Sequence, residues 1–203
     1  MQIPLEVIGL SKIYNNKDAV KDISFKVNKN EIIGILGPNG CGKTTTIGMI
    51  LGLLKPSNGK VLINGIEIEK KRVDLLNHLN FISPYIELPK KLTVKQNLEV
   101  YGRLYDVKNL KKKIEMLSEK LRLSEIINKL TGELSSGQKN RVSLAKSIIN
   151  NPTVLLLDEP TASLDPETGD FVRSFLESYQ KENKASILLA SHNMSEVERL
   201  CSS

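Results

Sequence analysis

A glycine-rich loop between a strand and a helix constrains this chain more than any other feature of its sequence. The loop reads Gly37-Pro38-Asn39-Gly40-Cys41-Gly42-Lys43-Thr44-Thr45 and follows the pattern G-x-x-x-x-G-K-T. The apolar run Ile32–Leu36 before it predicts a buried strand, and Thr46–Leu54 after it predicts a buried helix. Strand, loop and helix together form the context in which this pattern binds phosphate.

The loop predicts a site for a nucleotide and a metal ion. Its glycines let the backbone wind so that N–H groups point at phosphate oxygens, and the helix N-terminus adds partial positive charge on the same side. We expect Lys43 to reach the β- and γ-phosphates and the Thr44 hydroxyl to bind Mg²⁺. A chance glycine-rich turn is the alternative, and the flanking strand and helix argue against it.

Composition indicates an ordinary globular protein with a modest excess of positive charge. The 203 residues are 40% hydrophobic and 26% charged, with a net charge of +6. The densest basic clusters, Lys111–Lys113 and Lys90–Lys91, favour a solvated helix face, although an anionic membrane surface stays open. Aromatic residues are sparse near them, so we do not expect nucleic acid as a partner.

Three further features of the sequence indicate the cellular compartment of the protein. No apolar stretch approaches the roughly 20 residues needed to span a bilayer, and the first residues lack the pattern of a signal peptide. The two cysteines, Cys41 and Cys201, suggest neither a disulfide framework nor a metal site. We therefore expect a cytoplasmic protein.

The order of elements predicts an α/β fold of a single domain, residues 1–203. Alternating stretches at Leu5–Tyr14 and Ala19–Val27 indicate an antiparallel β-rich opening, and Asn64-Gly65 is a hairpin turn signal. Apolar strands and helices then alternate, which favours a mainly parallel sheet covered on both faces. We expect a core lobe of residues 1–75 and 151–203. Helical periodicity marks an insertion of residues 76–150, with helices at 94–105, 110–123 and 138–149.

Two adjacent carboxylates end the buried strand Val154–Asp158. The carboxyl ends of parallel strands line the edge at which ligands bind in open α/β sheets. We expect Asp158 to hold Mg²⁺, and Glu159 to orient and deprotonate an attacking water. Neighbouring side chains on a strand point in opposite directions, which suits two separate roles. A solvated strand end is the alternative interpretation.

A second potential phosphate site opens the helix predicted from Gln138. The run Leu134-Ser135-Ser136-Gly137-Gln138 has small residues that expose backbone N–H groups. Taken alone, such a run is usually no more than a helix N-cap.

The order of these motifs, followed by Ser163-Leu164-Asp165 and Ser191-His192, resembles that of the ATP-binding cassette family, the nucleotide-binding subunits of ABC transporters. The resemblance covers essentially the whole chain. It implies that Tyr14 stacks on adenine and that the segment Leu134–Gln138 is the signature motif that clasps the γ-phosphate. It also implies that Asp165 is the D-loop carboxylate and that His192 is the switch histidine. Alone, Tyr14 would more often be a half-buried strand aromatic, and His192 an ordinary surface histidine.

The sequence departs from the family pattern at two positions. The family signature is usually Leu-Ser-Gly-Gly-Gln, and Ser136 stands in place of its first glycine. The Q-loop glutamine is expected at Pro84, which has neither a side-chain amide nor a backbone N–H. Glutamine-dependent coupling of nucleotide to permease is therefore in doubt. The family pattern also continues beyond Ser191-His192 with further strand and helix, so we expect the C-terminal end of the usual domain to be missing.

The resemblance implies an ATPase subunit that powers a separate membrane permease from the cytoplasmic face of the cell membrane. Its cofactors would be ATP and Mg²⁺. Two copies, identical or related, would pair head-to-tail with each ATP between the phosphate loop of one and the signature motif of the other. The segment Pro84–Tyr105 is the expected docking surface for the permease. The alternatives are a cassette ATPase that acts on nucleic acid or ribosomes, and a module that binds ATP without useful hydrolysis.

Overall fold

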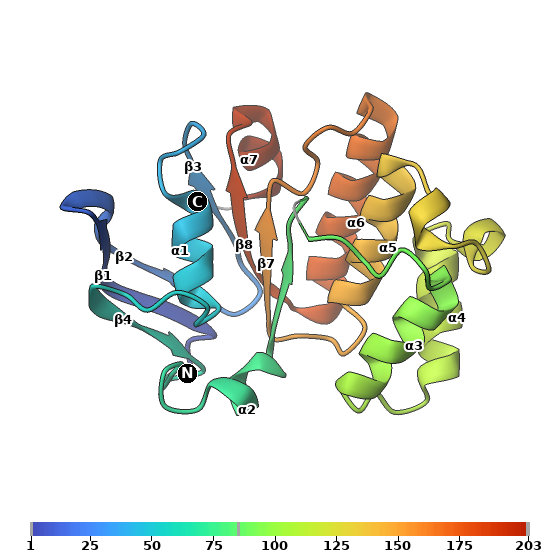
Figure 1. The fold of residues 1–203 in the computed structure, drawn as a ribbon, viewed down its shortest axis with the longest axis horizontal. Helices are drawn as coiled ribbons and strands as arrows, with labels where there is room; N and C mark the ends of the chain where they lie inside the picture. The colour runs from blue at the N-terminus through green and yellow to red at the C-terminus, as the bar shows by residue number, and fades with distance from the viewer. Residues whose placement is uncertain (1, 85, 202–203) are drawn as a thin grey trace.

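The fold contains two four-stranded sheets with one helix between them (Figure 1). The computed structural model describes residues 2–84 and 86–201. The first sheet is antiparallel, with strand order β2-β1-β4-β5, and the second is parallel, with order β3-β8-β7-β6. This confirms the α/β class expected from the sequence.

The antiparallel sheet comes from the N-terminal third of the chain. Its strands are β1 (Leu5–Tyr14), β2 (Lys17–Val27), β4 (Asn58–Ile63) and β5 (Ile66–Glu67). Asn64 and Gly65 join β4 to β5 with φ of 51° and 76°, the left-handed pair that a tight hairpin turn needs. The hairpin predicted from Asn64-Gly65 is therefore confirmed.

The parallel sheet aligns four strand ends along one edge. Its strands are β3 (Ile32–Leu36), β6 (Leu79–Ile82), β7 (Val154–Asp158) and β8 (Ser186–Ser191). Leu36 pairs with Ser191, and Asp158 pairs with Ala190. The loops that follow β3, β7 and β8 consequently start side by side, although the first is more than a hundred residues from the other two in sequence.

Each face of the parallel sheet packs against its own helices, because successive side chains of a strand point to opposite faces. Val154 and Leu156 of β7 pack with helix α1 (Lys43–Ile50), whose other side meets the antiparallel sheet. Leu155 and Leu157 face the opposite core. The helices of that core are α3 (Val94–Leu104), α4 (Leu110–Lys120), α5 (Ser136–Ser147) and α6 (Pro166–Asn183).

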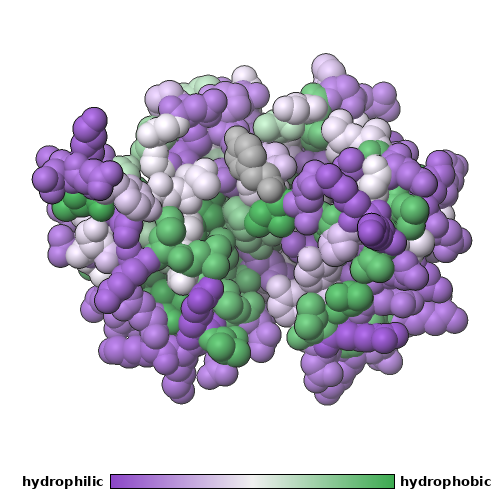
Figure 2. Space-filling view, viewed as in Figure 1, coloured by the Kyte–Doolittle hydropathy of each residue, from purple (hydrophilic) through white to green (hydrophobic). Residues whose placement is uncertain are grey.

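Short elements complete the chain. They are α2 (Arg72–Leu76), α7 (Met194–Leu200) and two 3₁₀ turns, Ser124–Ile126 and Thr131–Glu133. Figure 2 shows apolar side chains on the viewed face over the regions of α1, α2 and α3. Val73 of α2 is 80% exposed, and Leu104 of α3 is 71% exposed. No helix within residues 2–84 and 86–201 is long and apolar enough to cross a membrane.

Several boundaries differ from the sequence-based expectations. Strand β6 lies inside the span 76–150 that we expected to be helical, because its pairing with β7 makes it part of the parallel sheet. The helical part therefore begins after Ile82. Helix α1 begins at Lys43 instead of Thr46, and α5 begins at Ser136 instead of Gln138. Tyr85, within the expected docking segment, lies outside the described residues, as do Met1, Ser202 and Ser203.

Candidate nucleotide-binding site

The glycine-rich loop connects β3 to α1 at the aligned edge of the parallel sheet. Gly42 is the N-cap of α1 with φ of 99°, and a Cβ built on it would lie 2.4 Å from the carbonyl oxygen of Ala19. Only glycine suits this position, because L side chains rarely adopt such a φ and the backbone of β2 passes too close. The tight turn presents the start of α1 to the space above the sheet.

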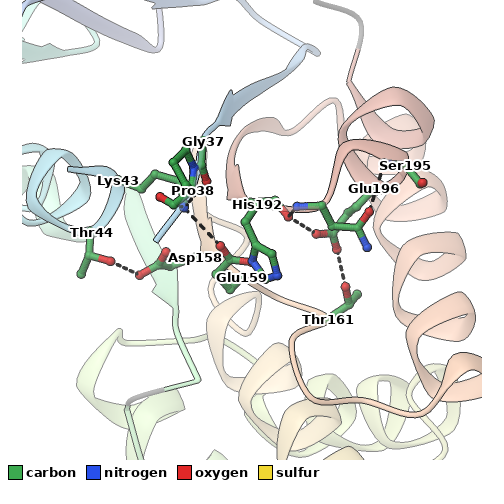
Figure 3. Close-up of polar contacts among 12 residues, drawn as sticks. Gly37, Pro38, Lys43, Thr44, Asp158, Glu159, Thr161, His192, Ser195 and Glu196 are labelled. Carbon is green, nitrogen blue, oxygen red and sulfur yellow. Dashed lines mark hydrogen bonds and ion pairs between the residues drawn. The ribbon is translucent and has the colours of Figure 1, made fainter. Parts of the chain in front are cut away.

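Lys43 points back into the curve of the loop (Figure 3). Its ammonium donates hydrogen bonds to the carbonyl oxygens of Gly37 at 2.6 Å and Pro38 at 3.1 Å. It also lies 3.5 Å from Oε1 of Glu159. The residue is only 7% exposed. The positive charge is thus held inside the curve of the loop, and its contact with phosphate stays a prediction.

Thr44 and Asp158 face each other across the loop and the end of β7. The Thr44 hydroxyl donates to Oδ2 of Asp158 at 3.1 Å. Burial raises the pKa of the Asp158 carboxyl above its ordinary value. The hydrogen bond from Thr44 opposes this rise, the charge of Glu159 adds to it and Lys43 opposes it. A hydroxyl and a carboxylate supply the hard oxygen ligands that Mg²⁺ prefers.

These two residues do not enclose a metal ion by themselves. Among residues 2–84 and 86–201 no cluster of three or more His, Cys, Asp or Glu side chains has the arrangement of a metal site. Mg²⁺ commonly takes one or two protein ligands and completes its shell with waters and substrate phosphates. The donor set of Thr44 and Asp158 fits that mode of binding.

Glu159 and His192 meet beside Lys43. Nδ1 of His192 lies 2.7 Å from Oε2 of Glu159. Oε1 of Glu159 is buried and has no hydrogen-bond partner among the described residues, apart from the longer ion-pair contact with Lys43. The expected alternation of Asp158 and Glu159 along one strand is wrong: β7 ends at Asp158, and Glu159 has a left-handed φ of 51°. This turn directs both carboxylates toward the loop.

The segment Leu134–Gln138 lies apart from the phosphate loop. Leu134 is buried, whereas Ser135 and Ser136 are exposed at the start of α5. Ser135 and Gln138 form a capping box, in which each side chain accepts a hydrogen bond from the other's backbone N–H. Figure 1 shows α5 and α1 on opposite sides of β7. Ser135 is thus the N-cap of α5, and one copy of the chain does not bring the two motifs together.

Asp165 lies at the start of α6, and Tyr14 lies at the end of β1. Asp165 caps α6, and the hydrogen bond that it accepts from the backbone N–H of Thr168 at 2.9 Å lowers the pKa of its carboxyl. Tyr14 ends β1, is 45% exposed, and carries the Lys12 ammonium 5.1 Å from its ring centroid. An exposed ring can stack on a base, and the Lys12 ammonium already occupies one face of this ring.

Pro84 lies in a cleft with the start of α5 and the turn before α6. It is exposed just beyond β6 and lines a cavity of about 380 Å³ together with Ser136 and Asn140 of α5 and Ser163. Pro84, which we expected at the Q-loop position, is therefore close to both segments. Proline can fill space there without donating a hydrogen bond.

Glu196 is a polar residue of this region that the sequence did not reveal. It is 2% exposed on α7 and accepts hydrogen bonds from Thr161 and Ser191. A glutamate on a short helix ordinarily faces water, and neither composition nor spacing marks this one as different. Only the packing of α7 against β3, β8 and α6 buries it.

Comparison with known proteins adds an independent finding. The family model described as ABC transporter matches residues 20–162. ABC transporter ATP-binding protein NatA of Bacillus subtilis is 36% identical over 188 residues, which cover 91% of this chain and 76% of that protein. Nod factor export ATP-binding protein I of Rhizobium johnstonii is 39% identical over 202 residues, covering 98% of this chain and 64% of that protein.

Solved structures show the same likeness. One described as an ATP-binding subunit of an ABC transporter has a TM-score of 0.88 at 27% identity, covering 97% of this chain and 82% of that chain. CbiO1 of Clostridium perfringens, described as part of the ABC transporter complex CbiONQ, has a TM-score of 0.85 at 30% identity. That match covers 99% of this chain and 83% of the other. The chain thus spans between about two thirds and four fifths of these relatives.

Proposed function

The chain belongs to the ABC transporter family as an ATP-binding subunit with the fold of an ATPase, and from that membership we propose how its residues use ATP to power a separate membrane permease. One observation carries the proposal. Lys43, Thr44, Asp158, Glu159 and His192, from three separate segments, converge at one edge of the parallel sheet with contacts of 2.7 to 3.5 Å.

In this proposal the loop Gly37–Thr45 binds the phosphates of ATP. Backbone N–H groups and the N-terminus of α1 supply partial positive charge, and Lys43 adds a full charge. Tyr14 stacks on the adenine from the end of β1. Thr44 and Asp158 hold Mg²⁺, which when bound neutralises charge on the phosphate oxygens.

Glu159 acts as the general base for the attacking water. Its buried Oε1 has no hydrogen-bond partner among the described residues, so it can accept a proton from a water that approaches it. Its other oxygen contacts His192, which fixes the orientation of the carboxylate. His192 is half exposed and reaches toward the γ-phosphate position. Positioned proton transfer of this kind contributes roughly 10²- to 10⁴-fold in rate.

A second copy, identical or related, completes the site. The exposed start of α5 lies on the opposite side of β7 from α1, so the N–H groups of Ser136 and Gly137, which the capping box does not use, are open to the ATP of another copy. Two such contacts related by a two-fold axis close the assembly. In this assembly Asp165, which is exposed at the cap of α6, communicates between the two sites.

The permease is the membrane partner in this proposal. The docking surface is the segment Pro84–Tyr105, in which Ile86, Val100 and Leu104 are large apolar side chains with 44% or more of their area exposed. Exposed apolar residues grouped in this way are typical of protein contacts. The subunit would then lie at the cytoplasmic face of the membrane. The transported substrate is set by the permease.

The Glu159→Gln variant tests this assignment. We expect it to bind ATP as the parent does, to lose most turnover, and to accumulate an ATP-bound dimer that size-exclusion chromatography detects. The Glu198→Gln variant, which changes an exposed glutamate of α7, is the matched control. Hydrolysis by Glu159→Gln at the parent rate would move the general-base role to another residue.

A further inference from the structure

The carboxylate of Glu196 is buried, and each of its oxygens accepts a hydrogen bond. Oε1 accepts a hydrogen bond from the Thr161 hydroxyl at 2.6 Å, and Oε2 accepts one from the Ser191 hydroxyl at 2.7 Å (Figure 3). Only 2% of the residue is exposed. Burying a carboxylate is costly unless it is hydrogen-bonded, and bonds to an ionised acceptor are short and strong. The two hydroxyls therefore have fixed positions relative to α7.

The first hydroxyl belongs to the turn that carries Glu159. Thr161 follows Glu159 by two residues, with the rigid Pro160 between them. The carbonyl oxygen of Pro160 accepts from Nδ2 of Asn140 at 2.7 Å, and Glu159 donates its own N–H to the carbonyl oxygen of Ala190 at 2.8 Å. The bond from Thr161 to Glu196 restrains the far end of this turn.

This restraint matters because Glu159 has a backbone conformation that glutamate rarely adopts. Its φ of 51° is in the left-handed region, which persists for an ordinary side chain only when the surroundings enforce it. Contacts on both sides of the residue supply that enforcement. Loss of the contact at Thr161 would let the turn relax and would change where the Glu159 carboxylate points.

The second hydroxyl belongs to the turn that carries His192. Ser191 is the residue before His192, and its Oγ also accepts from the N–H of Asn193 at 3.1 Å. The carbonyl oxygen of Ser191 accepts from the N–H of Gly37, at the start of the phosphate loop, at 3.3 Å. One carboxylate thus joins the turn of Glu159 to the turn of His192.

We propose that Glu196 is a positioning residue for ATP hydrolysis, which sets the approach of His192 to Glu159 by fastening both turns to α7. The inference rests on the function proposed above. Glu196 acts through Thr161 and Ser191 and makes no contact with the reacting groups. Its removal affects the chemical step and leaves the phosphate loop able to bind ATP.

The first test compares Glu196→Ala and Glu196→Gln in the full chain. A misplacement of catalytic groups by about 1 Å can cost on the order of 10²-fold, so we expect Glu196→Ala to lower kcat by about 10- to 100-fold with unchanged ATP affinity. Glu196→Gln keeps the size and one acceptor oxygen, and it recovers most of the rate. Glu198→Ala, exposed on the same helix, is the control and retains parent turnover.

A double-mutant cycle separates positioning from mere stability. In the His192→Ala background the Glu159–His192 contact is already absent and only the turn of Glu159 can still be displaced, so adding Glu196→Ala should lower kcat by a smaller factor than it does in the parent. Equal factors in both backgrounds, or a parent-like kcat for Glu196→Ala, would overturn the inference. If Glu196→Ala does not fold, Thr161→Val removes one hydroxyl at nearly constant shape, and the same cycle with His192→Ala decides.

The two proposals fail in different ways. If Glu159→Gln loses turnover and Glu196→Ala does not, the positioning role is wrong and the proposed function stands. If Glu159→Gln hydrolyses ATP at the parent rate, the proposed function is itself at fault, whatever Glu196→Ala shows.

Discussion

Replacement of Lys43 by alanine tests the phosphate loop most directly. The ammonium is 7% exposed and is held by the carbonyl oxygens of Gly37 and Pro38, with Glu159 at 3.5 Å. In the proposed function the ammonium is already held at the phosphate site before ATP arrives, so little side-chain ordering opposes binding. A hydrogen bond to a charged group is worth about 1.5–3 kcal/mol, and about 1.4 kcal/mol is tenfold, so we expect ATP affinity to fall about 10- to 140-fold.

The assay is isothermal titration calorimetry with a non-hydrolysable ATP analogue and Mg²⁺, so that turnover does not consume the ligand. Lys29→Ala removes an equal charge from the exposed turn after β2 and serves as the control for general electrostatic attraction. Circular dichroism verifies that each variant is folded. An unchanged affinity for Lys43→Ala would refute the assignment of the loop. An equal loss for Lys29→Ala would mean that net charge, rather than a specific contact, binds the nucleotide.

Three further perturbations probe the rest of the site. Burial raises the pKa of Asp158, so its charged form lowers the stability of the fold once pH exceeds the ordinary carboxyl range. Asp158→Asn should therefore raise the unfolding temperature at neutral pH, and this increase should shrink as pH falls. The same variant should impair hydrolysis. An unchanged or lower unfolding temperature at neutral pH would contradict this. A bulky maleimide on the exposed Cys41 should block ATP binding, and bound ATP should protect Cys41 from the reagent. Burial raises the pKa of the Cys201 thiol to about 11, so Cys201 should react slowly. Full binding after verified modification would refute the idea. Steady-state turnover with the permease present should be comparable in the parent and in Pro84→Gln, because Lys43, Asp158, Glu159 and His192 supply the main contacts. A silent parent rescued by Pro84→Gln would indicate a regulatory module that only binds ATP.

Local chemistry made several features predictable. The pattern from Gly37 to Thr45 specifies a loop because glycine alone tolerates the φ of 99° at Gly42. The apolar runs Ile32–Leu36 and Val154–Asp158 are short and bounded by turn residues, which favours buried strands over helices. The placement of Asp158 follows, since the carboxyl end of a parallel strand is the edge at which ligands bind.

Element boundaries were less predictable, because neighbours in space decide them. The residues of β6 are few and lie beside a long helical stretch, and only pairing with β7 makes Leu79–Ile82 a strand. Helix α5 begins at Ser136 because Ser135 and Gln138 cap each other, a reciprocal pair that the sequence permits but does not require.

The sequence by itself determined the nucleotide loop, the α/β class and the residue types that the chemistry needs. Tertiary structure decided how those residues meet. The register of β3, β7 and β8 brings Lys43, Glu159 and His192 together from distant segments, and the packing of α7 turns Glu196 from a surface residue into a buried link between two turns. The reason is physical: propensity and pattern act over a few residues, whereas burial and cross-strand register depend on segments that only the complete fold brings into contact.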